Sequence, residues 1–158
     1  MSYKVTKVSG AAASASPAEK FQTFEDLEVY KFRKAMYAVS RRLTDFEKYE
    51  LGRQIRRAAV SLTNNMAEGH GRFHYPDQIR FFLHSRGSLE ELVDDLNVCL
   101  DENYLFHDEI RKLKEQARGV LILINGYLRF LRSRSTKVRE IDEADSELLD
   151  GLDGLLSL

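Results

Sequence analysis

The residues best suited to chemistry lie in one stretch, QIRRAAVSLTNNMAEGHGRFHYP, residues 54–76 of this 158-residue chain. Arg53, Arg56 and Arg57 cluster at its start. On a helix whose apolar stripe includes Ile55, the two adjacent arginines point to the flank and the back of the helix. Such a basic ridge can pair with acidic side chains of its own or a neighbouring helix, contact a protein partner or bind nucleic-acid phosphates. The residues alone leave all three interpretations open.

The same stretch ends in polar residues that we expect to have a structural role. Asn65 falls where the apolar stripe should continue, so its amide should be partly buried and hydrogen-bonded. Glu68 lies one turn further on, within reach of Arg72 or of Arg86 in the next segment. We interpret Asn65, Glu68, Arg72 and Arg86 as a structural polar network at the end of a bundle.

Other polar residues do not match a catalytic or metal-binding pattern. His70 and His74 are four apart, a spacing that metal ligands use on a helix, but they flank a glycine and precede a proline, so we expect them in a turn. Acidic residues repeat one turn apart in a later segment, as a solvated face or as partners of arginines: Glu90, Glu91, Asp94 and Asp95. No nucleophile elbow, phosphate loop or dinucleotide fingerprint occurs. We therefore expect no catalytic residue, metal, cofactor or small-molecule substrate.

The net charge of −1 conceals an uneven distribution along the chain. Residues 1–20 carry three basic and one acidic residue, residues 21–134 carry 19 and 17, and residues 135–158 carry two and seven. A dedicated nucleic-acid binder is usually clearly basic, so this balance weighs against that class. The single cysteine, the lack of an apolar leader and the lack of a membrane-spanning run predict a cytoplasmic protein.

The elements that must position these residues are helices. Apolar residues recur every three or four positions in four segments, residues 24–43, 49–67, 76–102 and 108–134. The predicted core stripes are Val29, Phe32, Met36, Val39 and Leu43; Leu51, Ile55, Ala58, Leu62 and Asn65 or Met66; Phe82, Ser85, Leu89, Leu92, Leu96 and Cys99; and Ile110, Leu113, Ala117, Val120, Ile124, Leu128 and Leu131. Thr23 can cap the first helix, and Gly69 and Gly71 should end the second in a left-handed turn.

Short connections between such helices favour antiparallel neighbours. The predicted fold class is all-α, an antiparallel up-down-up-down four-helix bundle. We divide the chain into a disordered N-terminal segment, residues 1–22, a bundle, residues 23–134, and an acidic C-terminal tail, residues 135–158, that forms a short helix or is disordered. The small residues Ser85, Gly87 and Ser88 suggest that another helix crosses closely there.

Four segments, in order, resemble one family: FEDLEVYKFRKAMYAVSRRL, LGRQIRRAAVSLTNNMAEGHGR, IRFFLHSRGSLEELVDDL and INGYLRFL. They look like the four-helix-bundle proteins encoded within intervening sequences of bacterial 23S rRNA genes, over roughly residues 24–132. The resemblance implies a homo-oligomer, typically a pentameric ring, without catalytic activity. A relative similar in fold, the accessory variability determinant of diversity-generating retroelements, forms the same kind of ring and binds a reverse transcriptase and nucleic acid.

We therefore expect a ring-forming, non-enzymatic scaffold that associates with structured RNA or a ribonucleoprotein. The residues expected at this interface are Arg53, Arg56 and Arg57 together with the basic end of the fourth segment, Arg129, Arg132 and Arg134. The alternative is a protein-interaction scaffold or accessory subunit for a reverse transcriptase, with little nucleic-acid affinity of its own.

Overall fold

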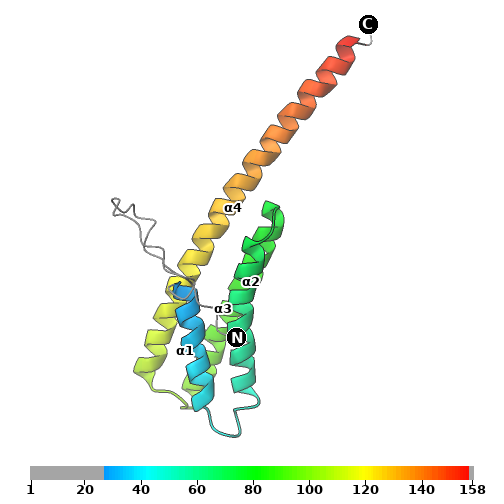
Figure 1. The fold of residues 1–158 in the computed structure, drawn as a ribbon. Coiled ribbons are helices and arrows are strands. Elements are labelled where there is room, and N and C mark those ends of the chain that lie inside the picture. The colour runs from blue at the N-terminus through cyan, green and yellow to red at the C-terminus, as the bar shows by residue number, and fades with distance from the viewer. Residues whose placement is uncertain (1–26, 157–158) are drawn as a thin grey trace, which may run out of the picture.

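The computed structural model describes residues 27–156, and the side chains of residues 27–139, as four α-helices (Figure 1). These are α1, Glu28–Arg42; α2, Leu51–His70; α3, Tyr75–Asp101; and α4, His107–Leu156. No strand occurs in this part of the chain, so the predicted all-α class is confirmed. Within the same residues, no helix is both long and apolar enough to cross a membrane.

The first helix begins at Glu28, later than the predicted start at residue 24. Thr23 and the predicted disordered segment lie outside the described residues. Leu27 precedes α1 in an extended conformation, and no side chain caps the helix. The Leu27 carbonyl accepts hydrogen bonds from the backbone amides of Tyr30 at 3.0 Å and Lys31 at 3.1 Å, which close the first turn.

The end of α2 differs from the prediction. Gly69 does not stop the helix but lies buried inside it, and Gly71 ends it in a right-handed conformation with φ of −78°. The physical reason is space: a Cβ on Gly69 would lie 2.9 Å from Cβ of Phe81 and 3.0 Å from the ring of Phe82. The glycine therefore permits close packing, not a left-handed turn. Asn103, after α3, does adopt a left-handed conformation with φ of 58°, as asparagine often does.

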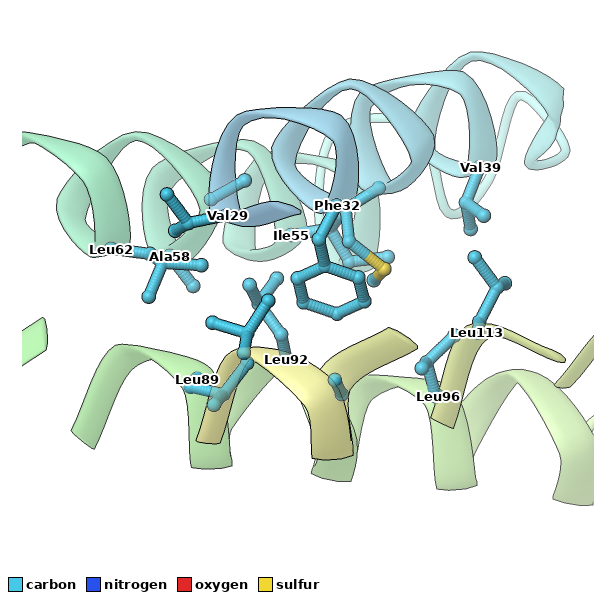
Figure 2. Close-up of a cluster of buried hydrophobic side chains, with 14 of the residues drawn as sticks. Val29, Phe32, Val39, Ile55, Ala58, Leu62, Leu89, Leu92, Leu96 and Leu113 are labelled. Atoms are coloured by element: carbon cyan, nitrogen blue, oxygen red, sulfur yellow. The ribbon is translucent and has the colours of Figure 1, made fainter. Parts of the chain in front are cut away.

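The core lies where the four apolar stripes meet (Figure 2). The residues of the predicted stripes are buried except at the end of the α2 stripe, where Asn65 and Met66 are only half-buried. Figure 2 shows Phe32 and Val39 of α1 pointing inward, toward Leu92 of α3 and Leu113 of α4. Burying an aliphatic or aromatic side chain of this size contributes about 1.5–3 kcal/mol, which makes this contact region the main source of stability.

The main helix contacts follow one cycle: α1 packs on α2, α2 on α3, α3 on α4 and α4 on α1. The pair α2 and α3 packs most extensively, and Ser85 and Ser88 are buried against α2. Gly87 is not part of this contact, because a Cβ added there would meet no atom within 4 Å. The close crossing predicted for the small residues therefore involves the two serines alone.

The fourth helix does not end near residue 134 but continues to Leu156, well beyond the other helices (Figure 1). Leu131 is its last buried residue among the side chains described. The segment predicted to be a separate acidic tail is thus a continuation of α4 up to Leu156. No proline or strong stop signal interrupts the sequence after Leu131, so nothing local ends the helix.

Candidate functional site

The three arginines at the start of α2 do not share one surface. Arg53 and Arg57 are exposed one turn apart, whereas Arg56 is half-buried. The Arg56 guanidinium donates a hydrogen bond to the Lys48 carbonyl at 3.3 Å, in the connection before α2. Nη2 of Arg53 lies 3.9 Å from a carboxylate oxygen of Glu50, an exposed pair of little energetic weight. The predicted ridge is therefore reduced to two exposed residues, Arg53 and Arg57. Arg56 instead contacts the connection between α1 and α2.

Arg53 and Arg57 border a cleft whose other side is acidic. The cleft has a volume of about 460 Å³, and its lining comes from α2 and α3: Arg53, Gln54, Arg57, Glu91, Asp94 and Asp95. No ion pair within 4 Å joins the two sides among the described residues. A phosphate bound by these two arginines would lie close to three carboxylates, which repel it.

Asp95 is the buried member of this acidic set. Its side chain belongs to a residue only 8% exposed, and burial raises its pKa to about 6, with repulsion from Asp94 and Glu91 adding to the shift. Its Oδ2 atom has no hydrogen-bond partner in the described part of the chain. The sequence carried a signal for this burial, because Asp95 follows Leu92 by three positions and so lies on the same helical face.

The second group of predicted site residues consists of exposed arginines near the point where α4 leaves the bundle: Arg129, Arg132 and Arg134. They lie at the other end of the bundle from Arg57. The Tyr127 ring lies 4.5 Å from the Phe82 ring, and Phe82 packs against Gly69, so these three residues share one level. The twelve positions from Arg57 to Gly69 span about 18 Å along α2. The structure therefore does not bring the two arginine groups together.

The middle part of α4, residues 116–139, is more basic than the net charge of the chain suggests. Between Glu115 and Glu140 the sequence contains no acidic residue. The same stretch contains six basic residues: Arg118, Arg129, Arg132, Arg134, Lys137 and Arg139. Three of them, Arg129, Arg132 and Arg134, are binding residues predicted from the sequence. All six side chains are exposed. Residues 116–139 of α4 therefore form a locally basic stretch, bounded by Glu115 on one side and by Glu140, Asp142 and Glu143 on the other.

Asn65 belongs to a chain of polar contacts between α2 and α3. Its half-buried amide Nδ2 donates to the carbonyl of Ser61 at 2.8 Å and to the Ser61 hydroxyl at 3.0 Å. The Ser88 hydroxyl donates to the same Ser61 oxygen at 2.8 Å, and the Ser85 hydroxyl donates to the Leu62 carbonyl at 2.6 Å. The predicted partial burial of Asn65 is confirmed. The serine partners were missed, although Ser85 lies on a predicted stripe.

The other residues of the predicted polar network make separate contacts. Glu68 and Arg72 form an exposed ion pair, and the Arg72 guanidinium lies 4.8 Å from the centre of the Phe81 ring. Arg86 is on the next helix and lies 3.5 Å from the Asn125 side-chain oxygen of α4. The structure thus does not join Asn65, the surface pair and Arg86 into one network.

A polar contact that the sequence did not indicate connects α1 and α4. Arg42 donates two hydrogen bonds to the carboxylate of Glu109, one of them at 3.0 Å. The hydrogen bond raises the pKa of Arg42 and lowers the pKa of Glu109. Nearby, the hydroxyl of Tyr104 donates to Glu47 at 3.0 Å. The first contact joins α1 to α4, and the second joins the two connections at this end of the bundle.

One face of α4 is apolar although it points away from the core. Ile122 is 60% exposed, Leu123 53% and Phe130 48%. Gly119 and Gly126 lie on the same face, opposite the buried stripe, and a Cβ on either would meet no atom within 4 Å. A helix that is apolar on both faces usually has both faces covered in the functional state.

An apolar cavity of about 600 Å³ lies where α1 begins, between the end of α2, the first part of α3 and the middle of α4. Leu27, Met66, Phe82 and Tyr127 are among its lining residues. Its lining is mostly hydrocarbon and offers packing surface, not an arrangement of acids and bases. In the described residues, no group of three or more metal-ligating side chains occurs in this cavity or elsewhere.

A protein-family model described as "23S rRNA-intervening sequence protein" matches residues 25–126. The match covers more than half of the chain and includes α1, α2, α3 and α4 as far as Gly126. The polar cleft lies inside the matched region, whereas Arg129, Arg132 and Arg134 lie beyond it. No curated protein matches this chain.

Proposed function

Because the chain belongs to the 23S rRNA-intervening sequence protein family, we propose that it is a non-enzymatic scaffold that associates with structured RNA or a ribonucleoprotein in the cytoplasm. The observation that carries this proposal is the basic, acid-free part of α4 between Glu115 and Glu140. Its arginines are exposed on a helix that extends beyond the bundle, where a nucleic acid can approach from several sides. Phosphate neutralisation by such side chains supplies most of the affinity for nucleic acids.

The arginines of α2 are the weaker candidates for phosphate contact. Arg56 is half-buried and bonded to the Lys48 carbonyl. Arg53 and Arg57 share their cleft with three carboxylates, so the local charge there is not positive. The RNA-binding role that the sequence suggested for both groups is therefore assigned here mainly to Arg129, Arg132 and Arg134.

The proposed scaffold is a homo-oligomer, a pentameric ring of up-down-up-down antiparallel bundles. Support for the antiparallel order comes from contacts between α2 and α3: Leu62 meets Ser85, while the later Gly69 meets the earlier Phe82. Support for assembly comes from the apolar outer face of α4, which includes Ile122 and Phe130. Ring closure requires two different surfaces on each subunit, and this face is one of them.

The experiment that tests the RNA proposal measures binding of a fluorescent RNA hairpin at two salt concentrations. The variant Arg129→Gln, Arg132→Gln, Arg134→Gln should lower the affinity and reduce the salt slope, because each lost phosphate contact removes about 0.7–0.9 from that slope. The matched control replaces three other arginines with glutamine: Arg53, Arg56 and Arg57. The proposal fails if the control variant loses as much affinity as the α4 variant, or if the wild type binds no hairpin at low salt.

A second function is favoured by the near-neutral charge of the bundle, +2 over residues 21–134. In this alternative the chain is a protein-interaction scaffold or an accessory subunit for a reverse transcriptase. Binding to a purified reverse transcriptase, with no measurable affinity for the hairpin, would support it. The position of the gene also distinguishes the two functions. A position within an rRNA gene supports RNA association, and a position beside a reverse transcriptase gene supports the accessory role.

A further inference from the structure

The floor of the cleft between α2 and α3 holds a buried carboxylate with an unused acceptor. Asp95 is only 8% exposed, and its Oδ2 has no hydrogen-bond partner in the described part of the chain. A buried polar group without a hydrogen-bond partner destabilises the folded state, and a charged group does so more strongly. A donor from outside the cleft would remove this cost.

The residues around Asp95 determine what kind of donor fits. Glu91 and Asp94 line the same side of the cleft and, like Asp95, only accept hydrogen bonds when ionised. Arg53 and Arg57 line the other side, but neither makes an ion pair with the three carboxylates. The charges that line the cleft therefore sum to −1 when all five groups are ionised. A cation is attracted to the acidic side, and an anion is not.

We infer that this cleft is a binding site for an arginine side chain of a protein partner, whose guanidinium donates to Oδ2 of Asp95. A guanidinium is planar, stays charged and presents several N–H donors, so it can reach Glu91 or Asp94 at the same time. A volume of about 460 Å³ accommodates one such side chain. Arg53 and Arg57 then remain as donors for backbone carbonyls beside the inserted arginine.

The site is separate from the proposed RNA-binding surface. Arg57 lies about 18 Å along the bundle from the level at which the α4 arginines begin. The cleft also differs from that surface in charge, because it contains three carboxylates, whereas residues 116–139 of α4 contain none. Binding of a partner arginine therefore does not depend on RNA binding, and either can fail without the other.

The ionisation of Asp95 makes the inference measurable. Burial raises its pKa to about 6, and a bound guanidinium should lower that pKa because it stabilises the carboxylate. The titratable and charged groups around it are Glu91, Asp94 and Cys99 of its own helix and Arg53 and Arg57 of α2. Glu47, in the connection before α2, acts on Cys99. Affinity for an arginine should fall about tenfold between pH 7.5 and pH 5, as Asp95 takes up a proton.

The test is an NMR titration that follows the Asp95 side-chain carboxyl in the whole protein. N-acetyl-arginine amide should shift this signal in a saturable way and lower the pKa of Asp95. N-acetyl-citrulline amide, which has the same shape without the charge, should not. Asp95→Asn should abolish the binding, whereas Asp101→Asn, an exposed position at the end of the same helix, should leave it unchanged.

A second variant keeps the test decisive if Asp95→Asn alters the fold. Arg57→Gln removes a like charge from the rim and should strengthen arginine-amide binding several-fold. The inference is overturned if arginine amide gives no saturable shift, if the citrulline compound shifts the signal equally, or if inorganic phosphate binds in place of the cation. It is also overturned if Arg57→Gln raises the pKa of Asp95 without strengthening binding, since Arg57 itself would then be the partner of Asp95.

Discussion

Gly69 of α2 lies directly against Phe81 of α3, so closely that a Cβ on the glycine would be 2.9 Å from the Cβ of the phenylalanine. The ring of Phe82 borders the same position at 3.0 Å. The Cβ of Phe81 is attached directly to the backbone and cannot rotate away. The spacing between these two helices is therefore set by the absence of a side chain at one position.

Replacing this glycine should destabilise the bundle. Gly69→Ala forces the two helices apart at a cost of about 1–3 kcal/mol, which the better helix propensity of alanine, about 1 kcal/mol, offsets only in part. Gly87→Ala is the matched control, because its Cβ meets open space, and should raise the free energy of unfolding by about 0.5–1 kcal/mol. Urea denaturation should show a lower free energy of unfolding for Gly69→Ala and a higher one for Gly87→Ala. Two stabilised variants would show that α2 and α3 are not this close.

Neutralising Asp95 should stabilise the protein at neutral pH. The folded-state pKa of about 6 is raised above the ordinary value of 3.8, so the folded state binds the proton more tightly than the unfolded state. The ionised carboxylate therefore costs stability at pH 7, by up to about 3 kcal/mol, and this cost disappears as the pH falls from 6 to 4. Asp95→Asn should exceed the wild type in unfolding free energy at pH 7 and match it near pH 4. A pH-independent difference would contradict the raised pKa.

The ion pair between Arg42 and Glu109 should contribute modestly to the contact of α1 with α4. The pKa of Glu109 is lowered by its hydrogen bond from Arg42, so the stabilisation is present above the unfolded pKa of the carboxyl and is lost as pH falls through the folded pKa. A double-mutant cycle with Arg42→Gln and Glu109→Gln should give a coupling of about 0.2–1 kcal/mol at pH 7, because both side chains are partly exposed. The coupling should shrink in high salt and near pH 3. A coupling that salt leaves unchanged would mean that packing, not charge, joins the residues.

The outer face of α4 should be needed for assembly and not for folding. Ile122→Gln with Phe130→Gln removes exposed apolar surface and should reduce the mass measured by light scattering, with the helical content unchanged. Phe46→Gln, at an 83% exposed position in the connection after α1, is the control and should leave the mass unchanged. If the variant keeps its oligomeric mass, the interface lies elsewhere. If the wild type is a monomer, the proposed ring assembly is wrong.

Deleting residues 140–158 should strengthen RNA binding if the basic part of α4 contacts phosphates. The deleted part carries seven acidic residues and no basic residue, and its negative field opposes an approaching RNA. A full-length variant with those acids changed to glutamine or asparagine separates charge from length and should show the same increase. Unchanged affinity in both variants would mean that the RNA contacts another surface.

The helices and the core were predictable because their signal is local. An α-helix repeats every 3.6 residues, so a stripe such as Ile110, Leu113 and Ala117 identifies its buried face without knowledge of any partner helix. Asn65 was placed on the edge of such a stripe for the same reason, and it is half-buried. The family resemblance added the expected order of segments and is confirmed over residues 25–126.

The surroundings of charged and small residues were not predictable, because they depend on how separate helices pack. The sequence by itself determined that Asp95 is acidic and follows a core leucine, and that Arg57 is one turn from Arg53. Only the tertiary structure decided that Asp95 and Arg57 border one cleft, and that Gly69 lies against Phe81. The physical reason is that periodicity belongs to one helix, whereas these neighbours are set by the register and distance between α2 and α3, to which every residue of their shared core contributes.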